Sequence, residues 1–435
     1  MTYEIFPGKK IFPIKTDTAC LLKWAWSTIN LGTGKTSSCH RTEPYKIDPE
    51  NFQDFHNLPE KIQAREKMLQ GQWPGHGCEY CKNVEMNGGM SDRLMTLERS
   101  HGLDKIPPEL LVDPTATSVT PIILEVYFNN TCNLSCVYCD PVLSSKWNDE
   151  IRKYGDIEIG NFKKTFHIAS NDRYQRMISD FWSYLETDQR YKIIRHFQLL
   201  GGESLLQQEL DQSLDFWEHH KNSSLTFNMI TNMMLPHKKF VEKMQRFEYL
   251  VKTESILQLE LTASLDCWGP QQEYVRWGLD LETWQQNFEW MLDKPWCKLA
   301  IHSCISSLTI KTLPELIEKI NHWNKKRSPE NFIEHSFDLV VGEPQKVNGM
   351  HPTVFGGGVF DEDFSRVIDL MPVDTETQKT ARQQMQGQAL FVKNSVKNTE
   401  RIKTLQAFLD ELDRRRKCDW RTLFPWLDRD WDLVS

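Results

Sequence analysis

The sequence lacks several features that would point to particular classes of protein. It has no uninterrupted apolar run near the ~20 residues that cross a bilayer, so no membrane association is expected. Its first residues lack the apolar segment of a secretory signal, which favours a cytoplasmic location. It also lacks a basic stripe, and its net charge is −8, which argues against a nucleic-acid partner.

The 11 cysteines are not spread through the 435 residues as a disulfide framework would be. Seven of them fall into two groups with the spacing of metal ligands, which fits a reducing compartment. The length exceeds what one compact core usually supports, so two or three structural units are expected.

The most informative stretch is 121–140, PIILEVYFNNTCNLSCVYCD. Residues 122–128 read as a buried strand, and the loop that follows carries Cys132, Cys136 and Cys139 in the pattern CxxxCxxC. Three thiolates at this spacing can each bind a different iron of a cube-shaped [4Fe–4S] cluster and leave the fourth iron open. Chance placement gives roughly 0.007 such patterns per chain. A structural zinc is the alternative, although zinc prefers four protein ligands.

This loop, with Tyr138 directly before its last cysteine, resembles the cluster loop of radical S-adenosylmethionine (SAM) enzymes. The resemblance implies that SAM chelates the open iron through its amino and carboxylate groups. One electron from the cluster then cleaves SAM and releases a 5′-deoxyadenosyl radical. It also implies an electron donor of the flavodoxin or ferredoxin type.

A second cysteine set precedes this loop. Cys20 and Cys39 flank Gly34, whose turn signal would fold Cys39 back beside Cys20, and Cys78 and Cys81 form a CxxC pair. Four thiolates suit either zinc or a [4Fe–4S] cluster, and spacing does not decide between them. The pattern resembles the twitch and SPASM modules that carry a second, auxiliary [4Fe–4S] cluster, with the order inverted because here the module comes first.

Between 121 and 342, six apolar runs alternate with longer polar or helical stretches, which predicts a parallel α/β sheet. The runs are 122–128, 194–200, 225–230, 257–265, 299–306 and 336–341. Six units predict an open, partial (β/α)6 TIM barrel, as the resemblance also implies. Residues 1–100 are expected to form the auxiliary-cluster module, 101–120 a linker, and 343–435 a Gly/Pro loop with a helical C-terminal extension.

Four further predictions concern three helical segments and an insertion. Helices are expected at 58–69, at 174–185 and, as two or three surface helices, within 376–417. The long gap after residue 140 contains the insertion NDEIRKYGDIEIGNF, which we expect to form a lid or to bear on substrate.

The second strand of the predicted barrel ends in Gly201, Gly202 and Glu203. Glycines allow a close backbone approach to a ligand, and a carboxylate beside them accepts hydrogen bonds from an ammonium group. An ordinary strand–helix turn also explains the pattern. By resemblance it is the GGE motif that holds the SAM amino group. Residues 231–235, TNMML, resemble the family's TNG turn with Met233 in place of glycine.

The fourth strand ends in LTASLDCWGP, where Ser264 and Asp266 alternate on one face and are candidates to bind a ribose hydroxyl. A helix cap is the alternative for Asp266. Arg276 matches a position that contacts the SAM carboxylate in related enzymes, and a surface ion pair is the alternative.

The sequence therefore predicts a radical SAM enzyme that abstracts hydrogen from a substrate. By resemblance to twitch and SPASM enzymes, a peptide or protein side chain is the expected substrate. Two alternatives stay open: a small metabolite as substrate of a dehydrogenase or rearrangement enzyme, and a non-catalytic iron–sulfur or zinc protein.

Overall fold

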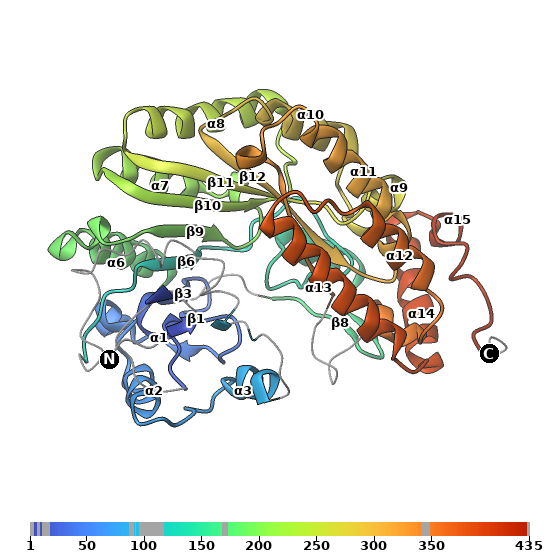
Figure 1. Cartoon of the computed structure of the whole chain (residues 1–435), viewed down its shortest axis with the longest axis horizontal. Helices are drawn as coiled ribbons and strands as arrows, with labels where there is room; N and C mark the ends of the chain where they lie inside the picture. The colour runs from blue at the N-terminus through green and yellow to red at the C-terminus, as the bar shows by residue number, and fades with distance from the viewer. Residues whose placement is uncertain are drawn as a thin grey trace.

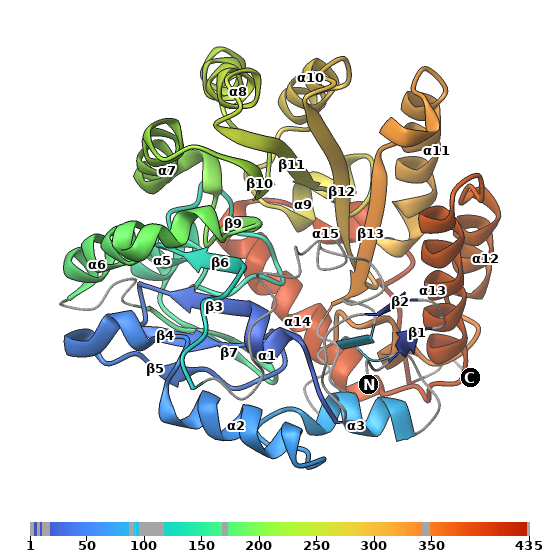
Figure 2. The same cartoon turned by 60° about the vertical axis from the view of Figure 1, so that its left-hand side comes forward.

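The computed structural model of the chain describes residues 4–6, 9–10, 18–86, 91, 93–94, 117–167, 173–340 and 349–432. Its central feature is a nine-stranded sheet in the order β13-β12-β11-β10-β9-β6-β3-β4-β5 (Figures 1 and 2). Among the described residues, no helix is both long and apolar enough to cross a membrane.

Seven consecutive strands of this sheet are parallel, and six of them are the strands that the sequence predicts for a partial barrel. Each lies within about three residues of its predicted range, although residue 341 lies outside the described residues. The strands are β6 (Ile123–Tyr127), β9 (His196–Leu200), β10 (Asn222–Thr231), β11 (Ile256–Ser264), β12 (Cys297–Ile305) and β13 (Glu334–Leu339).

Helices cover the outer side of the curved sheet (Figure 2). Leu259, Leu261 and Ala263 alternate along β11, so they share one face of the strand, and all three are fully buried. The predicted helix at 174–185 is confirmed as α6. The covering helices are α6 (Tyr174–Glu186), α7 (Gln208–His219), α8 (His237–Lys252), α10 (Leu281–Met291) and α11 (Leu313–Asn324). The short helix α9 (Pro270–Val275) lies instead on the inner side of the sheet (Figure 2). Short 3-10 turns lie at Thr187–Lys192, Ser204–Leu206, Ile310–Thr312 and Pro329–Asn331.

The N-terminal region contributes strands to the same sheet. Strand β3 (Trp26–Asn30) runs parallel to β6, and β4 (Lys35–Ser37) and β5 (Tyr45–Lys46) continue the sheet antiparallel. The predicted turn between β3 and β4 is present, with Gly34 at φ +67°. The 1–100 region is therefore joined to the barrel through hydrogen bonds, while most of the expected linker, 101–116, lies outside the described residues.

The remaining N-terminal elements come before β3 or after β5 in the chain. The predicted helix at 58–69 is confirmed as α2. These elements are β1 (Glu4–Phe6), β2 (Lys9–Lys10), α1 (Leu22–Ala25), a 3-10 turn (Pro49–Asp54), α2 (Pro59–Leu69) and α3 (Glu79–Met86).

The insertion after the cysteine loop forms α5 (Ser145–Tyr154) and a hairpin of β7 (Ile157–Ile159) and β8 (Phe162–Lys164). The hairpin packs on the C-terminal extension: the rings of Phe162 and Phe408 are stacked with their centroids 4.2 Å apart. The expected role as a lid over substrate stays a prediction.

The C-terminal extension is helical, as predicted (Figure 1). Leu405, Phe408, Leu409 and Leu412, which the sequence places at helical spacing, are all fully buried. The elements are a 3-10 turn (Pro352–Phe355), α12 (Asp361–Leu370), α13 (Glu376–Lys393), α14 (Thr399–Arg416) and α15 (Trp420–Leu423).

Candidate functional site

The loop with Cys132, Cys136 and Cys139 begins where β6 ends, at the carboxyl edge of the parallel strands. Its backbone is held from one side by the segment after α9, because the Ser135 N–H donates to the carbonyl of residue 277 at 3.0 Å. The N–H of residue 137 donates to the carbonyl of residue 275 at 2.8 Å. The carboxyl edge is where parallel α/β sheets place their sites.

The three thiols lie close enough to influence one another's ionisation. Burial raises the pKa of Cys132 to about 12, and the negative charge of Cys139 adds to this rise. Burial also raises the pKa of Cys136, with further rises from Cys139 and Cys132. The thiols are therefore favoured in the neutral form as long as no metal is bound. The positive charge of bound iron would favour their thiolate form, in which they can act as cluster ligands.

The three thiols of this loop are the number of ligands that a [4Fe–4S] cluster with one open iron requires. In the described part of the chain, no three His, Cys, Asp or Glu side chains are arranged to share one metal ion. A cubane has no need of such a triplet, because each thiolate binds a separate iron. The donor set of Cys132, Cys136 and Cys139 therefore fits a [4Fe–4S] cluster with one open iron.

The GGE turn holds the loop from the other side. The Gly202 N–H donates to the Asn129 carbonyl at 3.0 Å, and the Glu203 N–H donates to the Thr131 carbonyl at 2.7 Å. A Cβ on Gly201 would lie 2.3 Å from the Asn129 oxygen, and one on Gly202 would lie 2.2 Å from the Thr131 oxygen. In this structure the two glycines permit close contact with the cysteine loop, in addition to any approach to a ligand.

The carboxylate of Glu203 is buried and largely satisfied. It accepts hydrogen bonds from the Leu205 N–H at 3.0 Å, the Thr231 hydroxyl at 2.6 Å and the Asn232 N–H at 2.6 Å. A carboxylate has about four acceptor positions, so one remains for a further donor. Burial raises the pKa of Glu203, and these hydrogen bonds oppose the rise.

The turn after β10 has the shape that a TNG sequence would give, although Met233 replaces the glycine. Met233 is fully buried and has φ +61°, in the left-handed region that favours glycine. The Asn232 side chain donates to the Asn133 side-chain oxygen at 2.8 Å, which ties this turn to the cysteine loop. Met233 therefore has a backbone conformation that favours glycine, and its turn contacts the cysteine loop.

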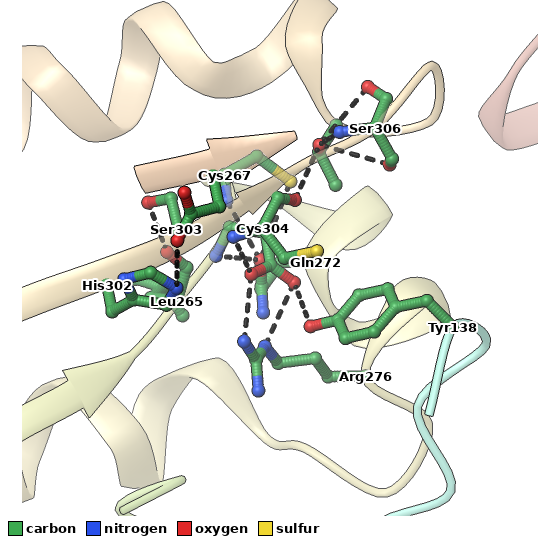
Figure 3. A network of polar contacts seen from close by, with 12 residues as sticks. Tyr138, Leu265, Cys267, Gln272, Arg276, His302, Ser303, Cys304 and Ser306 are labelled. Carbon is green, nitrogen blue, oxygen red and sulfur yellow. Dashed lines mark hydrogen bonds and ion pairs between the residues drawn. The ribbon is translucent and has the colours of Figure 1, made fainter. Parts of the chain in front are cut away.

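Asp266 is the centre of a buried polar network. Its partners Tyr138, Arg276 and Cys304 are labelled in Figure 3. Its Oδ2 accepts from the Tyr138 hydroxyl at 2.7 Å and from Arg276 Nε at 2.9 Å. Its Oδ1 accepts from a second Arg276 nitrogen at 2.8 Å and from the Cys304 N–H at 2.9 Å. All four acceptor positions are occupied in this arrangement, which leaves none for a ribose hydroxyl.

The structure thus brings Asp266 and Arg276 together as an ion pair. The ion pair that was the alternative for Arg276 is present, but it is buried, because Arg276 is 8% exposed. The alternative of a helix cap for Asp266 is wrong, because Gly269 occupies the N-cap position of α9. Ser264 is 9% exposed at the end of β11. Contacts of Ser264, Asp266 and Arg276 with SAM stay predictions.

Two buried cations beside the loop were not predicted from the sequence. Lys164, at the end of β8, donates to the Cys139 carbonyl at 2.5 Å. Arg416, at the end of α14, donates to the Ser135 carbonyl at 2.9 Å and pairs with Glu150 at 3.2 Å. Strand alternation offers one signal for Lys164, because it shares a face with the buried residue 162. No sequence signal links Arg416 to a loop some 280 residues earlier.

The second cysteine set lines a single cavity. About 40 Å³ of this cavity is open to the centres of water-sized molecules, more than one water requires. Its walls include all four predicted thiols: Cys20, Cys39, Cys78 and Cys81.

Positive side chains also line this cavity, among them Lys23, Arg41 and Arg93. Burial raises the pKa of Cys20 to about 12, and the charges of Lys23 and Arg93 oppose that rise. Four thiols and several cations suit a metal group that carries net negative charge once the thiolates bind it.

Comparisons with known proteins returned neither a matching family model nor a matching curated protein. Two solved structures are similar to this chain over part of its length. One is Streptococcus suis SuiB bound to the precursor peptide SuiA, with TM-score 0.32, 15% identity, and coverage of 73% of this chain and 62% of that chain. The other is anSMEcpe with bound AdoMet and the Kp18Cys peptide, with TM-score 0.31, 14% identity, and coverage of 57% and 58%. This chain thus spans about three fifths of each of those chains.

Proposed function

We propose that the protein is a radical SAM enzyme whose site is the loop of Cys132, Cys136 and Cys139. The observation that carries this proposal is the double anchoring of a three-thiol loop at the carboxyl edge of six parallel strands. Residues 275 and 277 hold the loop backbone on one side, and the GGE turn holds it on the other. An anchored loop keeps three thiolates in a fixed geometry for a cluster with one open iron.

In this proposal the chain supplies the binding site and the cofactors supply the chemistry. A cluster bound here would pass one electron to SAM and release a 5′-deoxyadenosyl radical, which takes hydrogen from the substrate. Glu203 has one acceptor position to offer the SAM amino group, beside Gly201 and Gly202. Tyr138 supports the loop by donating its hydroxyl to Asp266. The Asp266–Arg276 pair would have to open, or to act through water, to reach SAM.

The N-terminal cavity is proposed to hold a second, auxiliary [4Fe–4S] cluster through Cys20, Cys39, Cys78 and Cys81. What supports this is the convergence of four thiols on one cavity with Lys23 and Arg93 in its wall. A structural zinc would use the same four ligands. Iron analysis separates the two: about eight irons per chain for two cubanes, and about four irons with one zinc otherwise.

A peptide or protein side chain is the proposed substrate, on the resemblance of the cysteine patterns to twitch and SPASM enzymes. The electron is proposed to come from a flavodoxin- or ferredoxin-type protein. A small metabolite is the second candidate substrate.

The test is anaerobic reconstitution with iron and sulfide, followed by dithionite and SAM. Formation of 5′-deoxyadenosine is expected from the wild-type protein and its loss from Cys136→Ala. Cys78→Ala should retain some uncoupled cleavage, because it removes a ligand of the other site. A wild-type protein that binds iron but never cleaves SAM would instead be a non-catalytic iron–sulfur protein. Equal loss in both variants would contradict the proposed division between the two sites.

A further inference from the structure

Lys164 is a buried cation at the edge of the cysteine loop. It is 6% exposed, and its ammonium donates to the Cys139 carbonyl at 2.5 Å. The same ammonium lies 5.4 Å from the centre of the Trp147 ring, which is fully buried. Its neighbour Lys163 is exposed, as strand alternation requires.

Three buried cations surround the cysteine loop, and two of them have carboxylate partners. Arg276 pairs with Asp266 at 2.8 Å, and Arg416 pairs with Glu150 at 3.2 Å. In the part of the chain that the structure describes, no carboxylate lies within 4.0 Å of the Lys164 ammonium. A buried charge without a counter-charge is strongly unfavourable, so this position calls for an anion.

The cysteine loop is the part of the chain that places an anion beside Lys164 when it binds a cluster. The Lys164 ammonium is hydrogen-bonded to the backbone carbonyl of Cys139, the last of the three proposed cluster ligands. Asp140 follows Cys139 in the chain. Asp140 is exposed to solvent, whereas Cys136 is buried and Cys139 is half-buried. The thiolates are therefore the partners that share the low-dielectric environment of the lysine.

We propose that Lys164 is the counter-cation of the cluster bound by Cys132, Cys136 and Cys139, and that it makes this cluster easier to reduce. This inference rests on the proposed function and adds a positioning residue to it. The electron comes from an external reductant, dithionite in the test below. Lys164 forms and breaks no covalent bond and keeps its protons. It acts because each electron added to a thiolate-bound cluster increases the negative charge that it faces.

The hairpin that carries Lys164 is fixed in place, so the charge is held at a constant distance from the loop. Phe162 stacks on Phe408 of α14 at 4.2 Å. A Cβ on Gly160 would lie 2.4 Å from the Thr404 side chain, which shows how closely the turn of the hairpin approaches the same helix. In this view the hairpin at 157–164 supports the cluster loop rather than covering substrate.

Three variants test the role of the charge. Lys164→Met keeps the length of the side chain and removes its charge, while Lys164→Arg keeps the charge. Lys163→Met is the matched control, because it makes the same change at the adjacent exposed position. Each full-length protein is reconstituted anaerobically, its iron is counted, and the reduction of the loop cluster is followed by electron paramagnetic resonance during a redox titration.

The expected result is a shift of the midpoint potential to more negative values in Lys164→Met alone. We expect the equilibrium constant for reduction of the cluster to fall at least tenfold, which corresponds to a shift of about 59 mV for a one-electron couple. Lys163→Met should match the wild type, and Lys164→Arg should lie close to it. A Lys164→Met protein with full iron content and an unchanged potential would overturn the proposal.

A second measurement covers the case in which Lys164→Met fails to load iron. The proposal predicts that the cluster-free variant is at least as resistant to urea as the wild type, because an uncompensated buried charge has been removed. If Lys164→Met loads little iron but resists urea as well as the wild type does, and if Lys164→Arg loads iron normally, the proposal is supported. A cluster-free variant that is less stable than the wild type contradicts it. If the wild type itself binds no iron, the proposed function fails instead.

Discussion

Gly202 offers a direct test of how the cysteine loop is held. Its φ lies outside the left-handed region, so alanine meets no backbone penalty there and the cost of Gly202→Ala is steric. The new Cβ would lie 2.2 Å from the Thr131 oxygen, whereas ordinary contact begins at 3.4 Å. The loop must therefore retreat by about 1 Å, which breaks the Gly202 and Glu203 hydrogen bonds to it.

The magnitude follows from these losses. Two hydrogen bonds contribute about 1 kcal/mol each, and forcing a methyl group into packed structure costs about 1–3 kcal/mol. We expect Gly202→Ala to lower the free energy of unfolding by about 3–5 kcal/mol and to reduce iron loading. Urea denaturation of the cluster-free protein measures the first effect, and iron analysis after reconstitution measures the second.

Gly387→Ala is the control for this experiment. Gly387 lies within α13, and a Cβ there would meet no atom within 4 Å. Alanine should therefore stabilise the helix by about 0.5–1 kcal/mol, as expected for a glycine in a helix interior. If Gly202→Ala unfolds at the same urea concentration as the wild type and loads the same amount of iron, the GGE turn does not clamp the loop.

Other predictions concern buried groups. Asp266→Asn should lower the free energy of unfolding in urea by about 3–5 kcal/mol, because it leaves Arg276 buried without a counter-charge. The double variant with Arg276→Met should recover part of this loss. No recovery would contradict the pairing. Burial lowers the pKa of His56 well below 6.5, so the unfolded chain gains a proton first and stability falls as pH drops below about 6.5. His56→Gln should reduce that pH slope by up to about 1.4 kcal/mol per pH unit, and an equal slope would refute the assignment. Met233→Gly should be about 1 kcal/mol less destabilising than Met233→Ala, because φ is +61° there; the reverse order would show that the turn has rearranged.

The parallel strands were predictable from the sequence because each contains an apolar run, and the first of them is buried on both faces. The leading example is 122–128, which the structure has as β6 (Ile123–Tyr127). The position of β3 beside β6 was not predictable in this way. It depends on hydrogen bonds between residues about 97 positions apart, such as the one that the Thr28 hydroxyl donates to Glu125 at 2.6 Å.

The candidate site was predictable where one short motif contains all the residues, as for Cys132, Cys136 and Cys139. The roles of single residues were less accessible. The sequence suggests that Gly202 allows a ligand to approach the backbone. In the structure, the space that a Cβ on Gly202 would occupy lies against the Thr131 carbonyl. Lys164 carries no motif at all, and its place beside Cys139 follows from the packing of a hairpin on α14.

The central claim is that the cluster at the Cys132, Cys136 and Cys139 loop has one iron open to SAM. Electron paramagnetic resonance of the reduced, reconstituted protein tests it most directly, in a Cys20→Ala/Cys78→Ala background that removes ligands of the other site. Addition of SAM should change the spectrum of the remaining cluster, because a new ligand joins one of its irons. A fully loaded cluster whose spectrum is the same with and without SAM would contradict the account.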